Sequence, residues 1–404
     1  MNILYINHYA GSPDMGMEFR PYYLSREWVK MGHTVTIIAG DYSHLRNKNP
    51  EVTRDFQTEN IDGIEYVWVK TGTYEGNGVA RALTMERFVR KLLLHSRKIA
   101  TTYQPDVVIA SSTYPLDTYP AQRIAKIAEA KYVHEVHDMW PATLYEVGGM
   151  SRRHPFVVAM QIAENSAYKH CDKCIALAPY SKEYMCAHGL KPEKFFNLQN
   201  GIAEEEWENA TRLPQEQQNF FEEQKGKFIV GYFGGHALSN ALDTILDTAK
   251  LTGNPNIVFV LVGNGVEKER LVQRKEKEKI QNLFFLNAVR KEYIPDLVSH
   301  FDCSIITAKP SPLYRFGLCV NKMYDSMMAG KPIICAISAP KTLVEEYECG
   351  IQVRSADPAD IRDAVIMLYS MGQEKRAALG QNGKKAVLEH FTYKNLAAEF
   401  LSSI

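Results

Sequence analysis

The sequence predicts an α/β protein built from two doubly wound halves, each with a mostly parallel sheet. The chain has 404 residues, which is longer than an ordinary single domain, so two domains are expected. In each half, short apolar runs alternate with amphipathic stretches, a pattern typical of β-α-β units. A polar segment rich in Gln and Glu separates the halves and is expected to be a linker.

The first domain is expected to span residues 1–202. Its strands are predicted at 2–6, 34–40, 65–70, 106–111, 131–137 and 173–178. Its helices are predicted at 20–32, 83–103, 119–130, 154–169 and 180–188.

The linker is expected at 203–226 and the second domain at 227–387. The strands of this domain are predicted at 228–234, 256–263, 282–288, 303–308 and 331–336, with a helix through 243–250. The final stretch, 388–404, has the pattern of one amphipathic helix, which either caps the second domain or packs back on the first.

The overall charge excludes a protein with a strong global field. Lys and Arg total 47, and Asp and Glu also total 47, so nucleic acid is not an expected partner and any anion site must be local. No apolar run is long enough to span a bilayer. The chain starts directly in a strand pattern, without a basic segment or cleavage site, which favours a cytoplasmic location.

Three loops of the second half are candidates for binding a diphosphate. In open parallel sheets, ligands bind beyond the carboxyl ends of the strands. Gly234 and Gly235 follow the first strand of this half, and Gly263 and Gly265 follow the second. Glycines there allow a ligand to approach the backbone closely.

The third loop precedes a helix expected to begin near Asn321. Gly317 permits an unusual turn, and the exposed N–H groups of the helix start favour phosphate oxygens. Lys322 adds a full positive charge in the first helical turn. Asp325 lies four residues beyond Asn321 on the same face of the helix, where it is placed to accept hydrogen bonds from ribose hydroxyls.

The first half offers a loop after its first strand, with Gly11 and Gly16, and a strand end at His137. The loop lacks a full G-x-G-x-x-G motif, which disfavours a nicotinamide-dependent dehydrogenase. His137 either contacts a sugar hydroxyl or a donor phosphate, or is a strand-end histidine bonded to backbone.

The predicted helix at 81–98 is basic and amphipathic. Two interpretations are open: it lies on an anionic membrane surface, or it packs with a solvated basic face. The cations are Arg81, Arg87, Arg90, Lys91, Arg97 and Lys98, beside Leu83, Phe88, Leu92, Leu93 and Leu94.

Together these residues resemble glycosyltransferase family 4, the retaining transferases of the GT-B fold, over nearly the whole chain. Within that family, the chain is similar to the WbuB-type L-fucosamine transferases of O-antigen and capsule biosynthesis. The matching segments are Gly16–Arg20, Lys30–Val35, His137–Pro141, Asn200–Ile202, Asn321–Asp325 and Met328–Pro332.

The resemblance implies a two-domain enzyme that binds a nucleotide sugar in its second domain and the acceptor in its first. Gly16 is then expected near the donor, and Glu18 and Arg20 near the acceptor. Arg87, Arg90 and Lys91 are expected to contact the acceptor or the membrane. The acceptor implied is an undecaprenyl-diphosphate-linked saccharide at the cytoplasmic face of the inner membrane.

The chain departs from the family pattern at two places. The first acid of the family's E-x7-E motif falls at Gly317, eight residues before Asp325. The usual Arg and Lys after the first glycine loop fall near His236 and Asn240. The diphosphate charge must then be met by helix N–H groups together with Lys322, Arg315, Lys309 or Lys291.

The expected reaction is a retaining transfer from a UDP-sugar without a metal or other cofactor. The sugar implied is an N-acetylated hexosamine, with N-acetyl-L-fucosamine as one candidate. Lys322, His137 and Arg315 are the expected catalytic residues, and Glu135 is a candidate nucleophile only by its proximity to His137. The alternatives are a non-hydrolysing UDP-sugar epimerase and a non-enzymatic nucleotide-sugar sensor.

Overall fold

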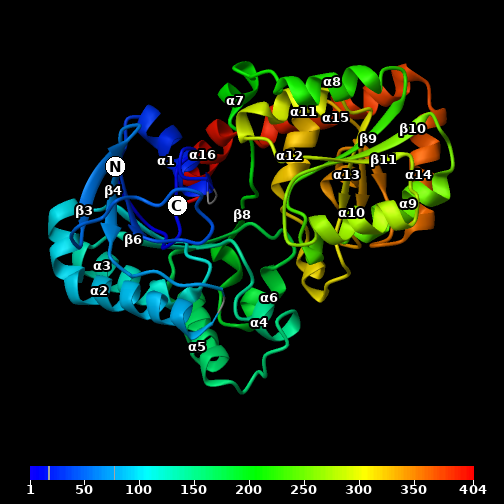
Figure 1. Cartoon of the computed structure of the whole chain (residues 1–404). Helices are drawn as coiled ribbons and strands as arrows, with labels where there is room; N and C mark the ends of the chain where they lie inside the picture. The colour runs from blue at the N-terminus through cyan, green and yellow to red at the C-terminus, as the bar shows by residue number, and fades with distance from the viewer. Residues whose placement is uncertain (17–18, 77) are drawn as a thin grey trace. The chain divides into compact units, whose positions relative to one another are not determined.

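The computed structural model describes residues 1–16, 19–76 and 78–404, which divide into two compact α/β units (Figure 1). The first unit comprises Met1–Gln199 and Tyr393–Ile404, and the second comprises Asn200–Thr392. The chain therefore leaves the first unit after Gln199 and returns to it at Tyr393.

The sheet of the first unit is parallel except at one edge. Over the described residues its order is β3-β4-β2-β1-β5-β6-β7-β8, and only β3 runs antiparallel, beside β4. The strands are β1 (Asn2–Ile6), β2 (Thr34–Gly40), β3 (Gln57–Ile61), β4 (Ile64–Val69), β5 (Val107–Ala110), β6 (Lys131–Val136), β7 (Lys173–Ala176) and β8 (Phe195–Asn197).

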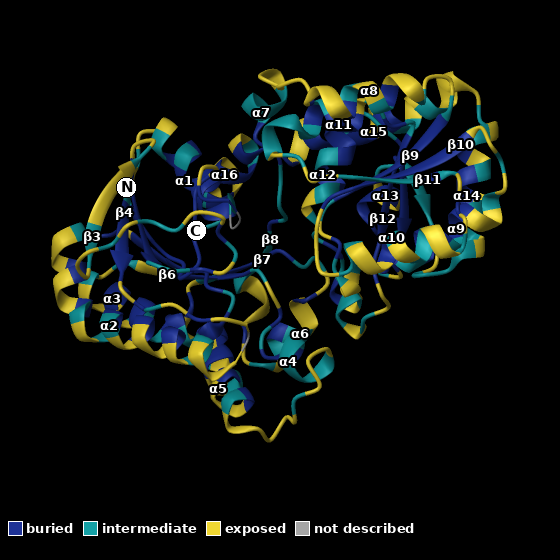
Figure 2. Ribbon diagram, in the orientation of Figure 1, coloured by how far each residue is buried: buried dark blue, intermediate teal, exposed yellow. Residues whose placement is uncertain are grey.

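Helices cover both faces of this sheet, which explains why its central strands are almost continuous apolar runs (Figure 2). Trp28 of the first helix donates its indole N–H to the carbonyl of Ala397 at 3.0 Å, and Tyr23 stacks on Tyr393. These contacts join the returning C-terminal helix to the first unit. The helices are α1 (Phe19–Lys30), α2 (Val79–Tyr103), α3 (Thr118–Ala128), α4 (Ala142–Glu146), α5 (Pro155–His170), α6 (Lys182–Ala187) and α16 (Tyr393–Ser402).

The sheet of the second unit is parallel throughout its described strands, in the order β11-β10-β9-β12-β13-β14. Its strands are β9 (Phe228–Phe233), β10 (Ile257–Val262), β11 (Leu283–Leu286), β12 (Cys303–Thr307), β13 (Ile333–Ala336) and β14 (Gly350–Gln352). Its helices are α7 (Glu204–Glu208), α8 (Gln215–Glu223), α9 (Leu242–Thr252), α10 (Lys268–Lys277), α11 (Ile294–Ser299), α12 (Asn321–Met328), α13 (Leu343–Glu346), α14 (Pro358–Ser370) and α15 (Gln373–His390).

The segment 203–226, expected to be a linker, is folded as part of the second unit. It contains α7 and α8. Leu213 and Phe221 are buried in the cluster that includes Phe301, and the Phe221 ring stacks on His300 at 4.5 Å. The segment has too few apolar residues for a clear periodicity, yet these few are sufficient to anchor it.

The predicted helix at 388–404 is divided in the structure. Helix α15 ends at His390 and α16 begins at Tyr393. Between them, the carbonyl of Phe391 accepts a hydrogen bond from the amide of Ile202 at 2.8 Å. This break separates a helix of the second unit from a helix of the first, at the point where the chain passes between them.

Candidate functional site

The two glycine loops of the second unit pack backbone to backbone beyond the carboxyl ends of β9 and β10. A Cβ atom on Gly263 would lie 1.9 Å from the carbonyl oxygen of Gly234, and one on Gly265 would lie 2.5 Å from that of His236. The amide of His236 also donates to the carbonyl of Asn264 at 2.8 Å. Only glycine therefore fits at Gly263 and Gly265, and a side chain there would separate the loops.

His236 lies at the centre of these loops. Its ring is fully buried, and neither ring nitrogen has a hydrogen-bond partner among the described residues. Burial, together with the charges of Lys268 and Lys322, lowers the pKa of His236 to about 4. With that pKa, His236 adds no fixed positive charge to the loops near neutral pH.

Lys322 brings a positive charge to the end of β9. Its Nζ atom donates to the hydroxyl of Tyr232 at 3.0 Å and lies 4.4 Å from the centre of that ring. The same Nζ atom would lie 3.1 Å from a Cβ atom on Gly234. Burial lowers the pKa of Lys322 to about 8. Among the described residues no carboxylate forms an ion pair with it, so its charge is available to an anion at the Gly234 loop.

Helix α12 starts at Asn321, and Val320 before it provides no side-chain cap. The amides of the first turn thus have no side-chain acceptor from the N-cap residue, as is common where a helix start binds an anion. Gly317 precedes it with φ of 95°, a conformation that favours glycine.

Asp325 lies one turn into α12, half-buried. Burial raises the pKa of its carboxyl to about 6, while the charge of Lys291 acts to lower it. Lys291 is itself paired with Glu206 of α7 at 2.9 Å. The structure thus places Lys291 beside the expected ribose acceptor and gives it a carboxylate partner, which reduces the charge it can offer a diphosphate.

Arg315, expected to be catalytic, lies exposed on the short turn Pro312–Phe316. Its guanidinium donates to the carbonyl of Pro312 at 2.7 Å and stacks on the Phe316 ring at 4.2 Å. These contacts are local to the turn, and they do not bring Arg315 to the glycine loops.

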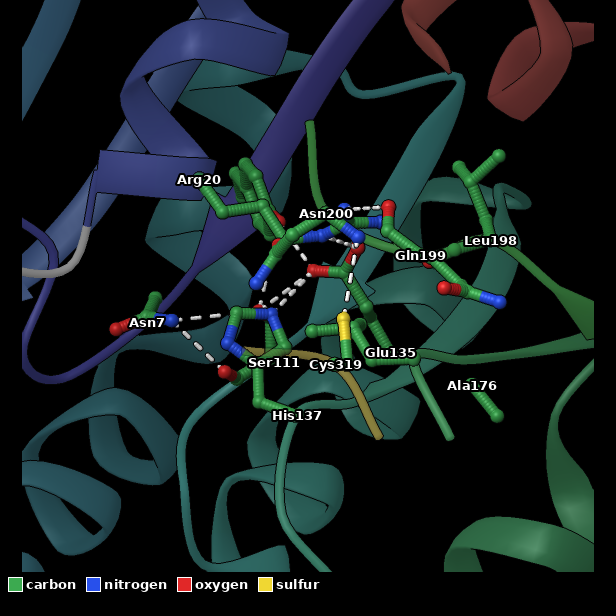
Figure 3. A network of polar contacts seen from close by, with 12 residues as sticks. Asn7, Arg20, Ser111, Glu135, His137, Ala176, Leu198, Gln199, Asn200 and Cys319 are labelled. Atoms are coloured by element: carbon green, nitrogen blue, oxygen red, sulfur yellow. Dashed lines mark hydrogen bonds and ion pairs between the residues drawn. The ribbon is translucent and has the colours of Figure 1, made fainter. Parts of the chain in front are cut away.

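At the carboxyl edge of the first unit's sheet, a polar network centres on Glu135 of β6 (Figure 3). One carboxylate oxygen accepts from Arg20 Nε at 2.9 Å. The other accepts from Ser111 Oγ and from His137 Nε2, both at 2.8 Å, and from the Tyr5 hydroxyl. Burial alone would raise the pKa of Glu135, but Arg20 and then His137 hold it well below its usual range.

This environment does not suit Glu135 as a nucleophile. The side chain is fully buried, and its two oxygens together accept hydrogen bonds from four donors. In the sequence, only the two-residue spacing of Glu135 and His137 indicates this network, because it places both residues on one face of the strand.

Arg20, expected near the acceptor, is buried inside the first unit. Its side chain is 4% exposed, and besides pairing with Glu135 its guanidinium donates to the carbonyls of Gln199 and Leu198 at 2.6 and 3.1 Å. A direct contact with a saccharide is therefore not available to it, and its role is to hold Glu135 and the end of β8. Gly16 adopts φ of 74° in the loop after β1, and Glu18 lies outside the described residues.

Helix α2 uses most of its apolar residues for packing. Phe88 and Leu92 are buried in the core, and Lys91 is paired with Asp55 at 2.6 Å. Its exposed face carries Leu83, Arg87, Arg90, Leu94, Arg97 and Lys98, with Leu83 47% and Leu94 71% exposed. We call these six residues the α2 stripe. Within it, Arg87 donates to the carbonyl of Thr71 and Arg90 pairs with Glu86.

Among the described residues, no helix is long and apolar enough to cross a membrane. No group of three or more His, Cys, Asp or Glu residues there is placed to hold a metal ion.

Comparisons with known proteins agree with this division of the chain. The family model "Glycosyltransferase Family 4" matches residues 15–206, and "Glycosyl transferases group 1" matches residues 215–386. A protein named "Probable glycosyltransferase WbjE" from Pseudomonas aeruginosa is 23% identical over 313 residues, which cover 74% of this chain and 76% of that protein.

Solved structures share the fold at low sequence identity. Sucrose-phosphate synthase from Thermosynechococcus elongatus aligns with a TM-score of 0.75 at 16% identity, covering 99% of this chain and 97% of that one. HepE from Anabaena, in complex with UDP and glucose, aligns with a TM-score of 0.66 at 16% identity over the full length of both chains. With both halves matched by transferase models and the two α/β units in place, the protein is a glycosyltransferase of the GT-B type.

Proposed function

We propose that this enzyme transfers a sugar from a UDP-sugar to a lipid-linked saccharide during the assembly of a bacterial surface polysaccharide. The observation that carries the donor assignment is the position of Lys322. Its ammonium forms no ion pair within the described part of the chain and lies against Gly234, where two glycine loops meet. HepE, which has the same fold, binds UDP and glucose. The resemblance to the WbuB-type transferases supports the polysaccharide role, and the Pseudomonas relative is named a probable glycosyltransferase.

The proposed mechanism relies on charge at the leaving group. As the glycosidic bond breaks, the nucleoside diphosphate gains negative charge, which Lys322 and the amides at the start of α12 stabilise. Since Glu135 is not available as a nucleophile, we favour attack from the same face as the departing diphosphate, which retains the anomeric configuration. These groups supply positive charge without a metal, so the transfer is proposed to be metal-independent.

The first test is turnover with a panel of UDP- and GDP-sugars, including UDP-linked N-acetylated hexosamines, with and without a polyprenyl-diphosphate-linked N-acetylglucosamine acceptor. We expect UDP release that requires both a UDP-sugar and the lipid acceptor and that persists in the presence of a chelator. Conversion of the donor without acceptor, or turnover restricted to GDP-sugars, would contradict the proposal.

Lys322 is expected to dominate catalysis. Replacing it by alanine removes the charge that stabilises the leaving group, so kcat should fall by about 100-fold or more. Because its pKa is about 8, kcat/KM of the native enzyme should decline as the pH rises above that value and Lys322 loses its proton. Lys322→Arg is the matched control, since arginine stays charged and should abolish this alkaline decline. Near-native kinetics of Lys322→Ala would refute the assignment.

Asp325 is expected to act in donor binding. A hydrogen bond to a charged group contributes about 1.5–3 kcal/mol, so Asp325→Ala should raise the donor KM about 10-fold or more and change kcat little. The carboxyl has a raised pKa of about 6, so it is protonated below that pH and accepts ribose hydroxyls less well. The donor KM of the native enzyme should therefore rise as the pH falls through 6, and Asp325→Asn should remove this dependence. An unchanged donor KM in both variants would exclude the ribose role.

The α2 stripe is proposed to contact anionic lipid. Each cation near such a surface contributes about 1 kcal/mol, and exposed leucines add apolar contact. The protein should float with anionic vesicles, dissociate in about 0.5 M salt as the charges are screened, and lose binding on Leu94→Glu. Leu251→Glu is the matched control, because Leu251 is a helical leucine of the second unit with 51% exposure. Equal effects of the two substitutions, or no binding by the native protein, would rule out this surface.

A further inference from the structure

Helices α2, α3 and α5 lie side by side on one face of the first unit's sheet (Figure 1). Helix α3 is in the middle and packs against both of its neighbours. One side of each helix is buried and the other is exposed (Figure 2). We call these three helices the helical layer. The α2 stripe is therefore one edge of a wider exposed surface.

The helical layer concentrates positive charge in a chain whose total charge is balanced. In the sequence of its three helices, the only carboxylates are Glu86, which pairs with Arg90, and Glu164, which is buried. Glu129, directly after α3, is exposed. The exposed cations of the layer and of the loop before α5 are Arg87, Arg90, Arg97, Lys98, Arg123, Lys126, Arg152, Arg153 and Lys169. Positive charge thus dominates the outer face of the layer.

The start of α5 adds apolar side chains to this face. Val158 and Ile162 are 42% and 58% exposed, and Val147 at the end of α4 is 58% exposed. Pro155 and Ala159 are also exposed, so an apolar face follows the i, i+3, i+4, i+7 spacing of a helix. We call Pro155, Val158, Ala159 and Ile162 the α5 patch.

Folding of the first unit does not explain the α5 patch. The opposite side of the helix already packs inward through Val157, Met160 and Ala163, which are buried. A surface helix normally carries polar residues on its outer face. Here the outer face is apolar over two turns, Arg152 and Arg153 precede it, and residues 147–163 contain no Asp or Glu. The patch therefore combines exposed apolar groups with positive charge.

Cations and apolar side chains distributed in this way fit an anionic bilayer. A site for one small anion would bring its cations together, whereas those of the helical layer are spread over three helices. A bilayer presents many headgroups, so dispersed cations can each contact one. Exposed apolar side chains enter the boundary between headgroups and acyl chains. The outer face of the layer thus has the chemistry of a lipid-binding surface.

We propose that the α5 patch is a second lipid contact of the first unit, so that the whole helical layer, and not α2 alone, lies on an anionic membrane. The inference deepens the contact proposed for the α2 stripe and rests on the proposed function only for the lipid-linked acceptor. A contact on one helix leaves a protein free to rotate about it, and a second contact on another helix fixes the orientation. Since α5 follows β6, its start lies near the carboxyl edge of the sheet. That edge is thereby held at the membrane, where a lipid-linked acceptor is found.

Vesicle flotation tests the contact without donor or acceptor. Ile162→Glu adds a carboxylate to the α5 patch, at a side chain exposed enough for the fold to tolerate it. Binding to vesicles that contain phosphatidylglycerol should fall about 10-fold or more, because an apolar contact is lost and a repulsive charge is gained. Met367→Glu is the matched control, since Met367 lies on α14 of the second unit and is 57% exposed. Unchanged binding by Ile162→Glu, or an equal loss by Met367→Glu, would overturn the proposal.

The cations are tested separately. Replacing Arg152 and Arg153 together by glutamine should weaken vesicle binding about 10-fold or more at low salt. Replacing Lys375 and Lys385, exposed lysines of α15, removes the same charge from the second unit and should change binding little. Equal losses would mean that net charge acts rather than this face, and would contradict the proposal. Equal binding of the native protein to vesicles of phosphatidylcholine alone would do the same, because that surface has no net charge.

Two comparisons separate this inference from the proposed function. Loss of vesicle binding by Leu94→Glu but not by Ile162→Glu would confine the contact to α2 and refute the α5 patch. With a water-soluble analogue of the acceptor, Ile162→Glu should keep the native rate, whereas with an acceptor embedded in anionic vesicles it should be about 10-fold slower. Equal slowing with both acceptors would indicate damage to the fold and count against the patch. Vesicle binding as expected, without turnover of any donor, would refute the proposed function and support the α5 patch.

Discussion

The buried ion pair between Arg20 and Glu135 is the interaction on which the organisation of the first unit depends. An isolated carboxylate in a dry interior is strongly unfavourable, and removing one partner of such a pair typically costs about 3–5 kcal/mol. Here the carboxylate is well satisfied: Glu135 accepts from Tyr5 of β1, from Arg20 of α1, and from Ser111 and His137. Arg20 also donates from its two terminal nitrogens to the carbonyls of Gln199 and Leu198. One carboxylate therefore links the central strands to α1 and to the last residues before the chain enters the second unit.

The two units differ in whether the charged group at the carboxyl ends of their strands has a partner of opposite charge. In the first unit, the negative charge of Glu135 at the carboxyl edge of the sheet is compensated by Arg20, and His137 also bonds to this carboxylate. In the second, Lys322 has no carboxylate partner among the described residues, and His236 is buried with both nitrogens unsatisfied. A partly desolvated cation without a carboxylate partner destabilises the protein when no ligand is bound. Such groups are typical of sites that bind an anion. This difference supports the proposal that the second unit binds the donor.

The sequence predicted features that depend on local pattern. Both parallel sheets, the glycine loops and the start of α12 near Asn321 follow from apolar runs, glycines and helix-start signals that are visible along the chain. Prediction from the sequence was wrong where the role of a residue depends on partners that are distant in the chain. Arg20 and Lys91 look like surface cations in sequence, but their partners Glu135 and Asp55 lie 115 and 36 residues away. The short, polar strand β3 (QTENI) and the folded segment 203–226 were missed because few apolar residues mark them.

The number of protons taken up when UDP binds shows whether the diphosphate lies against Lys322. Titration calorimetry at pH 8 in buffers of different ionisation enthalpy gives this number. Since the pKa of Lys322 in the free protein is about 8, about half of the molecules have it neutral at that pH, and a diphosphate beside it should restore the charge. Asp325, with a pKa of about 6, is already ionised there and contributes little. We expect uptake of about half a proton by the native protein and none by Lys322→Ala. UDP binding by the native protein without proton uptake would mean that the diphosphate does not lie against Lys322.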